Sequence, residues 1–99
     1  MTGRVPLARW QGLLGRAFRV HAGADRWLEL SLLEARALGG RPTPDGPLDC
    51  YSLVFRAADR GHVPQATYRL ESPDLGDLDV FLVPIGPDEA GMRYEAVFN

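Results

Sequence analysis

Three segments near the C-terminus, residues 67–71, 78–83 and 93–98, place their side chains with a period of two. Proline and glycine residues separate the segments, for example Pro73 and Gly76 before the second one. A period of two puts alternate side chains on opposite faces of a strand, and proline and glycine favour turns. The block therefore predicts three consecutive β-strands joined by short connections.

Three more strands are predicted upstream, at residues 18–21, 26–38 and 51–56. Alternation continues through the second of these segments, although its last part, residues 33–38, is also compatible with a helix. Residues 39–47 are rich in glycine and proline. Such a segment suits neither a helix nor a strand, so it is predicted to be the most mobile loop of the chain.

A short helix is predicted near the N-terminus, over about residues 6–14. Pro6 suits a first helical turn, and Leu7, Trp10 and Leu14 follow at offsets of three and four. No helix is predicted between the strands, and short connections cannot form parallel crossovers. The predicted fold is therefore mainly β, with about six antiparallel strands in a curled sheet or small barrel and one short N-terminal helix.

The composition is that of one ordinary globular domain, residues 1–99. The chain has 45% hydrophobic and 24% charged residues, and a chain of this size buries roughly 60–70% of its unfolded surface. Its formal net charge is −2, with acids and bases interspersed. Such a balance gives no strong field to hold a phosphate backbone or an anionic membrane. We therefore expect neither nucleic acid nor membrane as a partner.

Cysteine usage and hydropathy bear on the cellular compartment. Cys50 is the only cysteine, which excludes an internal disulfide and is consistent with a reducing compartment. No apolar run approaches the ~18 residues needed to span a bilayer, and the arginine-containing start lacks the apolar region of a signal peptide. We expect a soluble protein made in the cytoplasm.

Side chains that usually mark a nucleophilic active site are sparse. Cys50, His62 and Asp59 are the one combination of nucleophile, base and orienting acid to consider, and their spacing matches no known motif. Cys50 begins a predicted strand and His62 follows it, so the two are expected roughly 20 Å or more apart. We therefore predict no catalytic residue, and a small hydrolase is the least favoured function.

Metal and cofactor sites are not predicted either. The best candidate for a calcium site is an acidic set in the last two hairpins, comprising Asp74, Asp77, Asp79, Asp88 and Glu89. These residues lack the spacing that brings alternate oxygens onto one ion. A solvated acidic turn that protects edge strands explains them better.

Several apolar side chains fall on the strand face predicted to point outward, where a solvated sheet would carry polar residues. The helix could cover them, the sheet could fold over itself, or a partner protein could bind them. Cover by the chain itself is the simpler interpretation. As a candidate interface, the residues concerned are Trp27, Leu33, Val54, Phe81, Val83 and Val97.

These patterns leave two main functional hypotheses. Missing catalytic groups and surplus apolar positions favour a non-enzymatic protein-interaction or assembly module that binds a protein partner or associates with itself. The alternative is a small-ligand-binding barrel whose inner wall would include Tyr51, Tyr68 and Tyr94. Core tyrosines would explain the same residues without a ligand.

The C-terminal block also carries a recognisable motif. It reads Gln-x-x-Tyr-x-Leu-x-x-Pro-x-Leu-Gly from Gln65 to Gly76, then Phe-Leu-Val-Pro from Phe81 to Pro84, and finally Tyr-Glu-Ala-Val-Phe ending at Phe98. This motif resembles a small bacterial domain family of unknown function in which the position of Ser72 is usually His.

The resemblance covers most of the chain and implies no activity. Genes of that family often lie near phage-tail-collar-like genes, which implies an accessory or assembly role in a phage-tail-like system. Ser72 in place of the usual His argues against an indispensable ligand or base at that position.

Overall fold

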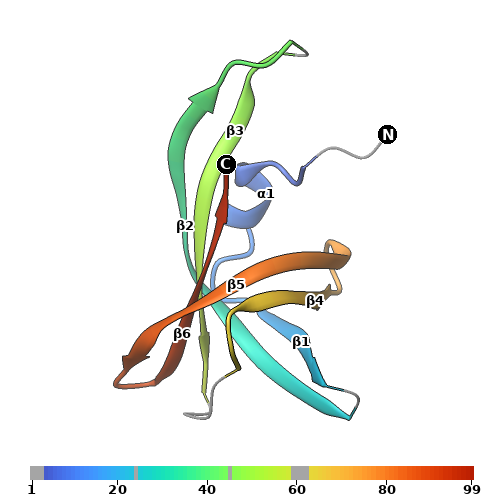
Figure 1. Cartoon of the computed structure of the whole chain (residues 1–99), viewed down its shortest axis with the longest axis vertical. Coiled ribbons are helices and arrows are strands. Elements are labelled where there is room, and N and C mark those ends of the chain that lie inside the picture. Colours follow the sequence, from blue (N-terminus) through green and yellow to red (C-terminus); the bar gives the residue numbers. More distant parts are fainter. Residues whose placement is uncertain (1–3, 24, 45, 59–62) are drawn as a thin grey trace.

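A computed structural model describes residues 4–23, 25–44, 46–58 and 63–99. This part contains six strands and one short helix (Figure 1). The elements are α1 (Leu7–Gln11), β1 (Ala17–Gly23), β2 (Arg26–Arg41), β3 (Leu48–Ala57), β4 (Ala66–Ser72), β5 (Gly76–Asp88) and β6 (Gly91–Phe98). The predicted fold class, six antiparallel strands in a curled sheet with a short N-terminal helix, is confirmed.

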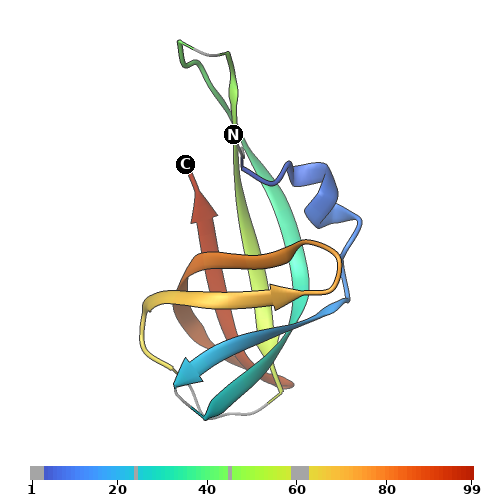
Figure 2. The ribbon, with the colours of Figure 1, turned by 90° about the vertical axis from the view of Figure 1, so that its right-hand side faces the viewer.

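The six strands form one ring-like sheet in the order β1-β2-β3-β6-β5-β4, and β4 pairs back onto β1. Every pair is antiparallel. Figure 2 shows β1, β4 and β5 crossing in front of β2, β3 and β6. The seam between β1 and β4 is short, since the described pairs there are Arg19 with Glu71 and Val20 with Leu70.

The core fills the inside of the ring. Period-two alternation sends one set of side chains inward from every strand, and this set is apolar. Trp10 enters the same core from α1, with its ring 5.9 Å from Phe18 and edge-on to Phe55 at 6.3 Å. The largest fully buried side chains are Trp10, Tyr51, Tyr94, Phe18, Phe55, Leu30, Leu32, Leu53, Leu70, Leu82 and Val20.

Helix α1 is shorter than predicted, because it ends at Gln11 rather than near residue 14. Gly12 forms the C-cap, and Gly15, at φ 84°, donates its N–H to the carbonyl of Leu32 over 2.8 Å. Glycine favours such a turn, which leads the chain into β1. Leu14, predicted to continue the apolar helical face, is instead 48% exposed.

None of the helices in the described ranges is long and apolar enough to cross a membrane.

Strand β2 is longer than predicted and continues through residues 39–41, which the sequence assigned to a loop. The register shifts between Ala37 and Gly39, and Gly39 has φ 95°. Because glycine tolerates positive φ, the strand passes through a bulge instead of ending there. The predicted loop at 39–47 is thus reduced to the tip between β2 and β3, where Asp45 lies outside the described residues.

The β2–β3 hairpin projects beyond the ring and gives the molecule its long axis, with extents of 42 × 27 × 23 Å (Figure 1). Strand β6 ends opposite Tyr51, so residues 48–50 of β3 and 39–41 of β2 pair with each other alone. We call residues 39–50 the β2–β3 arm.

Gly91 offers a test of the packing between β6 and β3. It is buried at φ 150°, and a Cβ there would lie 1.8 Å from the carbonyl oxygen of Ala57. We expect Gly91→Ala to lower the free energy of unfolding by more than about 4 kcal/mol, since backbone atoms must move. Urea denaturation measures this loss.

Gly86→Ala is the control, because Gly86 has φ 105° but open space around its Cβ position. Its free energy of unfolding should fall by only about 1–3 kcal/mol, which is the cost of an unfavourable backbone conformation. Equal losses in the two variants would contradict the close approach of Gly91 to β3.

Candidate functional site

The outer face of β3, β6 and β5 collects four of the predicted interface residues. Val54 lies opposite Glu95, and Glu95 lies opposite Val83 on the next strand. Val97 is two residues beyond Glu95, and Phe81 is two residues before Val83, so each shares the face of its strand neighbour. The sheet therefore groups residues from three strands on one side.

Strand β2 adds Leu33 through a second bulge. The register shifts between Leu32, opposite Phe55, and Glu34, opposite Val54. Leu33 is the extra residue of this bulge, so it lies beside Val54. We call Leu33, Val54, Phe81, Val83 and Val97 the outer apolar patch.

Exposure varies across the outer apolar patch. Phe81 and Val97 are 48% and 47% exposed, Leu33 and Val83 are half-buried, and Val54 is 9% exposed. Val54 lies between two neighbouring strands, which bury it within the sheet itself. Helix α1 inserts Trp10 into the ring interior and leaves Phe81 and Val97 uncovered. The simpler interpretation of the pattern was that the chain itself covers these residues. This is the case for Val54 but not for Phe81 and Val97.

Trp27 lies apart from the patch, at the start of β2. It pairs with His21 of β1, the two ring centroids are 3.7 Å apart, and the Arg19 guanidinium lies 3.9 Å from the Trp27 ring. His21 Nε2 is also 2.9 Å from Glu71 Oε2. Although Trp27 is 41% exposed, its ring therefore already stacks against residues of its own chain.

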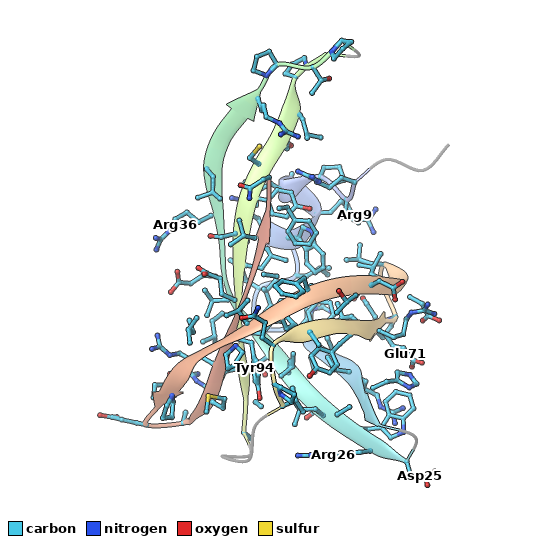
Figure 3. The ribbon with its side chains drawn as sticks, in the orientation of Figure 1. Arg9, Asp25, Arg26, Arg36, Glu71 and Tyr94 are labelled. Atoms are coloured by element: carbon cyan, nitrogen blue, oxygen red, sulfur yellow. The ribbon has the colours of Figure 1, made fainter. Side chains whose placement is uncertain are left out.

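Figure 3 labels one residue near each region, and these two labelled residues lie on opposite sides of the molecule. Glu71, the partner of His21, lies on one side, and Arg36 of β2 lies on the other. Arg36 is 3.0 Å from Glu34, which borders the outer apolar patch. The structure thus places Leu33, Val54, Val83 and Val97 on neighbouring paired strands, with Phe81 on the same face of β5 as Val83. Trp27 is separate from them and pairs with His21.

An ion pair borders the patch at its other end. Arg56 Nε donates to both carboxylate oxygens of Asp88, over 3.1 and 3.0 Å, and Asp88 also accepts from the N–H groups of Ala90 and Gly91. The hydrogen bond from Arg56, with these backbone donors, lowers the pKa of Asp88 to about 2. The pair links β3 to the β5–β6 hairpin.

The three tyrosines of the ligand-barrel hypothesis use their hydroxyls within the chain. Tyr51 accepts from Trp10 Nε1 at 3.0 Å and donates to the carbonyl of Val5, and Tyr94 accepts from the backbone N–H of Val63. Tyr68 donates to the carbonyl of Pro64. Burial raises the pKa of Tyr51 and of Tyr68. Tyr51 and Tyr94 are fully buried, so their rings belong to the core of the chain.

The other predicted candidates do not form a cluster in the described part of the chain. Cys50 is half-buried with its Sγ 3.7 Å from the carbonyl of Leu48, while Asp59 and His62 lie outside the described residues. Asp79 pairs with Arg69 at 2.7 Å. Within the described ranges no three acidic, histidine or cysteine side chains could hold a metal ion together.

Ser72, at the position where the resembling family usually has His, is 6% exposed. Its hydroxyl accepts hydrogen bonds from the backbone N–H groups of Asp74 and Leu75, each over 3.1 Å. These bonds close the turn between β4 and β5, so the side chain has a structural role there.

A cavity of about 240 Å³ lies beside the N-terminal segment. It is lined by Val5, Trp10, Tyr51, Leu78, Val80 and Phe98, together with Arg4 and Asp79. These residues come from the N-terminal segment, α1, β3, β5 and β6. Alternation predicts which side chains point inward, but it gives no sign that the N-terminal segment lies against the ends of β3 and β6.

Comparison with known protein families identifies the family of this chain. The model of the family described as Domain of unknown function (DUF6916) matches residues 5–98. The chain belongs to this family. No curated protein and no solved structure matched it. The resemblance to a domain family of unknown function is therefore confirmed at the level of the family, and membership assigns no activity.

The Arg56–Asp88 pair predicts how the stability of the fold depends on pH. A carboxyl whose pKa falls from 3.8 to about 2 on folding stabilises the fold fully above pH 3.8 and loses this contribution as the pH falls through about 2. We expect Asp88→Asn to be less stable than wild type at neutral pH, with the difference shrinking between about pH 4 and pH 2. Thermal melting across this range measures it.

Glu89→Gln, in the same hairpin, removes a carboxylate and keeps the Arg56–Asp88 pair. This control should follow the wild-type acid dependence. An Asp88→Asn protein whose deficit stays constant down to pH 2 would show that the carboxylate charge is not the stabilising feature.

Proposed function

We propose that this domain is a non-enzymatic protein-interaction or assembly module that binds a protein partner, or a second copy of itself, through the outer apolar patch. The observation that carries the proposal is the exposure of Phe81 and Val97, at 48% and 47%, on the outer faces of β5 and β6 beyond the point where these two strands stop pairing. Grouped apolar side chains that the chain leaves uncovered are typical of partner-binding surfaces.

The polar groups around the patch indicate what a partner must offer. Glu95 lies between Val54 and Val83 in the register. Covering this row would remove the Glu95 carboxylate from water, which is costly unless the partner donates hydrogen bonds to it. A fitting partner surface is therefore apolar with an arginine, lysine or tyrosine near its centre.

The wider role that we propose is accessory or structural, in a phage-tail-like system. The support for this is the resemblance of the motif from Gln65 to Phe98 to a family whose genes often lie near phage-tail-collar-like genes. An assembly factor of that kind needs a rigid binding face, and strands that belong to one ring-like sheet provide one.

The test is a comparison of self-association and partner capture. Light scattering across a concentration series measures the molar mass of wild type and of the double variant Phe81→Ser/Val97→Ser. We expect the double variant to lose any oligomer that wild type forms, because the apolar area driving association is removed. If wild type is monomeric, crosslinked capture from the native host replaces light scattering as the readout.

Leu14→Ser is the control, since Leu14 is 48% exposed and lies outside the patch. It should keep both the oligomer and the captured partner. Equal behaviour of the double variant and wild type in both assays, with unchanged circular dichroism, would contradict the proposal.

A further inference from the structure

The outer apolar patch contains an acidic side chain without a charged partner. Glu95 of β6 lies opposite Val54 on one side and Val83 on the other. It is half-buried, and within the described part of the chain it forms no ion pair. Water solvates this carboxylate while the patch is uncovered, but a hydrogen-bond donor must replace that water once the patch is covered. The patch therefore requires a cation from whatever binds it.

An exposed arginine lies on the opposite border of the same face. Arg36 of β2 pairs with Ser52 of β3, and Ser52 pairs with Val97 of β6. Ser52 and Val54 are two residues apart in one strand, so they point to the same face. Val54 is the residue opposite Glu95, so Glu95 and Arg36 both lie on the outer face. Two strand spacings and two residues put their Cα atoms roughly 12 Å apart, on opposite sides of β3.

Arg36 has hydrogen-bond donors to spare. Its Nη2 is 3.0 Å from Glu34 Oε1, the side chain is 72% exposed, and Figure 3 shows it extending outward from β2. A guanidinium has five N–H donors, and an exposed contact of this kind is weak. Arg36 can therefore bind a second carboxylate without any change in the ring.

The centre of the face, between these two borders, is low. Ser52 and Val54 on β3 are each 9% exposed, whereas Val97 beside Ser52 is 47% exposed. Recessed side chains at the centre, with exposed ones around them, allow another surface to pack closely against β3.

We propose that the occupant of the outer apolar patch is a second copy of this chain, related by a two-fold axis that lies over β3 between Ser52 and Val54. This axis exchanges the two borders of the face, so Arg36 of each copy contacts Glu95 of the other. The dimer then contains two identical ion pairs, which is the self-complementarity that an isologous interface requires. Val97 packs close to its own copy. The inference rests on the proposed function, because it names the partner of the same patch.

The experiment tests this pairing by charge reversal, with sedimentation velocity across a concentration series. We expect wild type to dimerise with a Kd of about 100 µM or tighter, as for an interface of modest size. Glu95→Arg alone and Arg36→Glu alone should each dimerise at least about tenfold more weakly, because like charges then face each other at both contacts. An equimolar mixture of the two variants should form a heterodimer about as tight as the wild-type dimer, since both contacts again join opposite charges.

Arg26→Glu is the matched control, because Arg26 is exposed at the start of β2, away from Arg36 (Figure 3). This variant should dimerise like wild type. Its heterodimer with Glu95→Arg should be weaker than the heterodimer of Arg36→Glu with Glu95→Arg, since one contact between like charges remains.

Dilution of wild type gives a readout that needs no variant. In nitrogen-15 NMR spectra the amide signals of Ser52 and Val97 should move with protein concentration. The signal of Val20, which pairs with Leu70 at the β1–β4 seam, should not move.

Three results would overturn the inference. The first is a wild type that stays monomeric up to about 1 mM; capture of another protein that depends on Phe81 and Val97 would then leave the proposed function intact. The second is a dimer whose Kd neither charge reversal changes. The third is a mixture of the two variants that associates no more tightly than each variant alone.

Discussion

The insertion of Trp10 into the ring is the contact on which the rest of the structure depends. A helix of five residues is far too short to be stable alone, so α1 depends on contacts with the ring, and Trp10 is its one fully buried side chain. Trp10 contacts Phe18 of β1 and Phe55 of β3, and its indole bonds to Tyr51. It thereby joins strands on two sides of a ring whose β1–β4 seam is short.

The closed ring also separates two kinds of surface. Inward side chains form the core and, where β5 leaves β6, part of the lining of the cavity beside Arg4. Outward side chains of the same strands form the outer apolar patch. Val80 and Phe81 are adjacent in the chain yet belong to different surfaces, since Val80 is buried and Phe81 is exposed.

Alternation in the sequence was sufficient for the fold class and for most core positions, since it reports directly which face of a strand is apolar. It missed the end of β2 because Gly39 reads as a breaker, whereas the structure uses its positive φ in a bulge. It grouped Trp27 with the interface residues because only the pairing register shows His21 opposite it. No pattern in the sequence predicted the contacts of Arg4, since its partners Asp49 and Asn99 are distant in the chain.

The β2–β3 arm has a consequence for the cooperativity of unfolding. Residues 39–41 of β2 and 48–50 of β3 pair with each other and with no other described strand, so few buried contacts resist their separation. A two-stranded ribbon in water is marginally stable by itself. The arm can therefore open while the ring stays intact, and its amide protons would exchange with solvent long before those around Leu53 and Tyr94. In this sense one small chain contains two units of very different local stability.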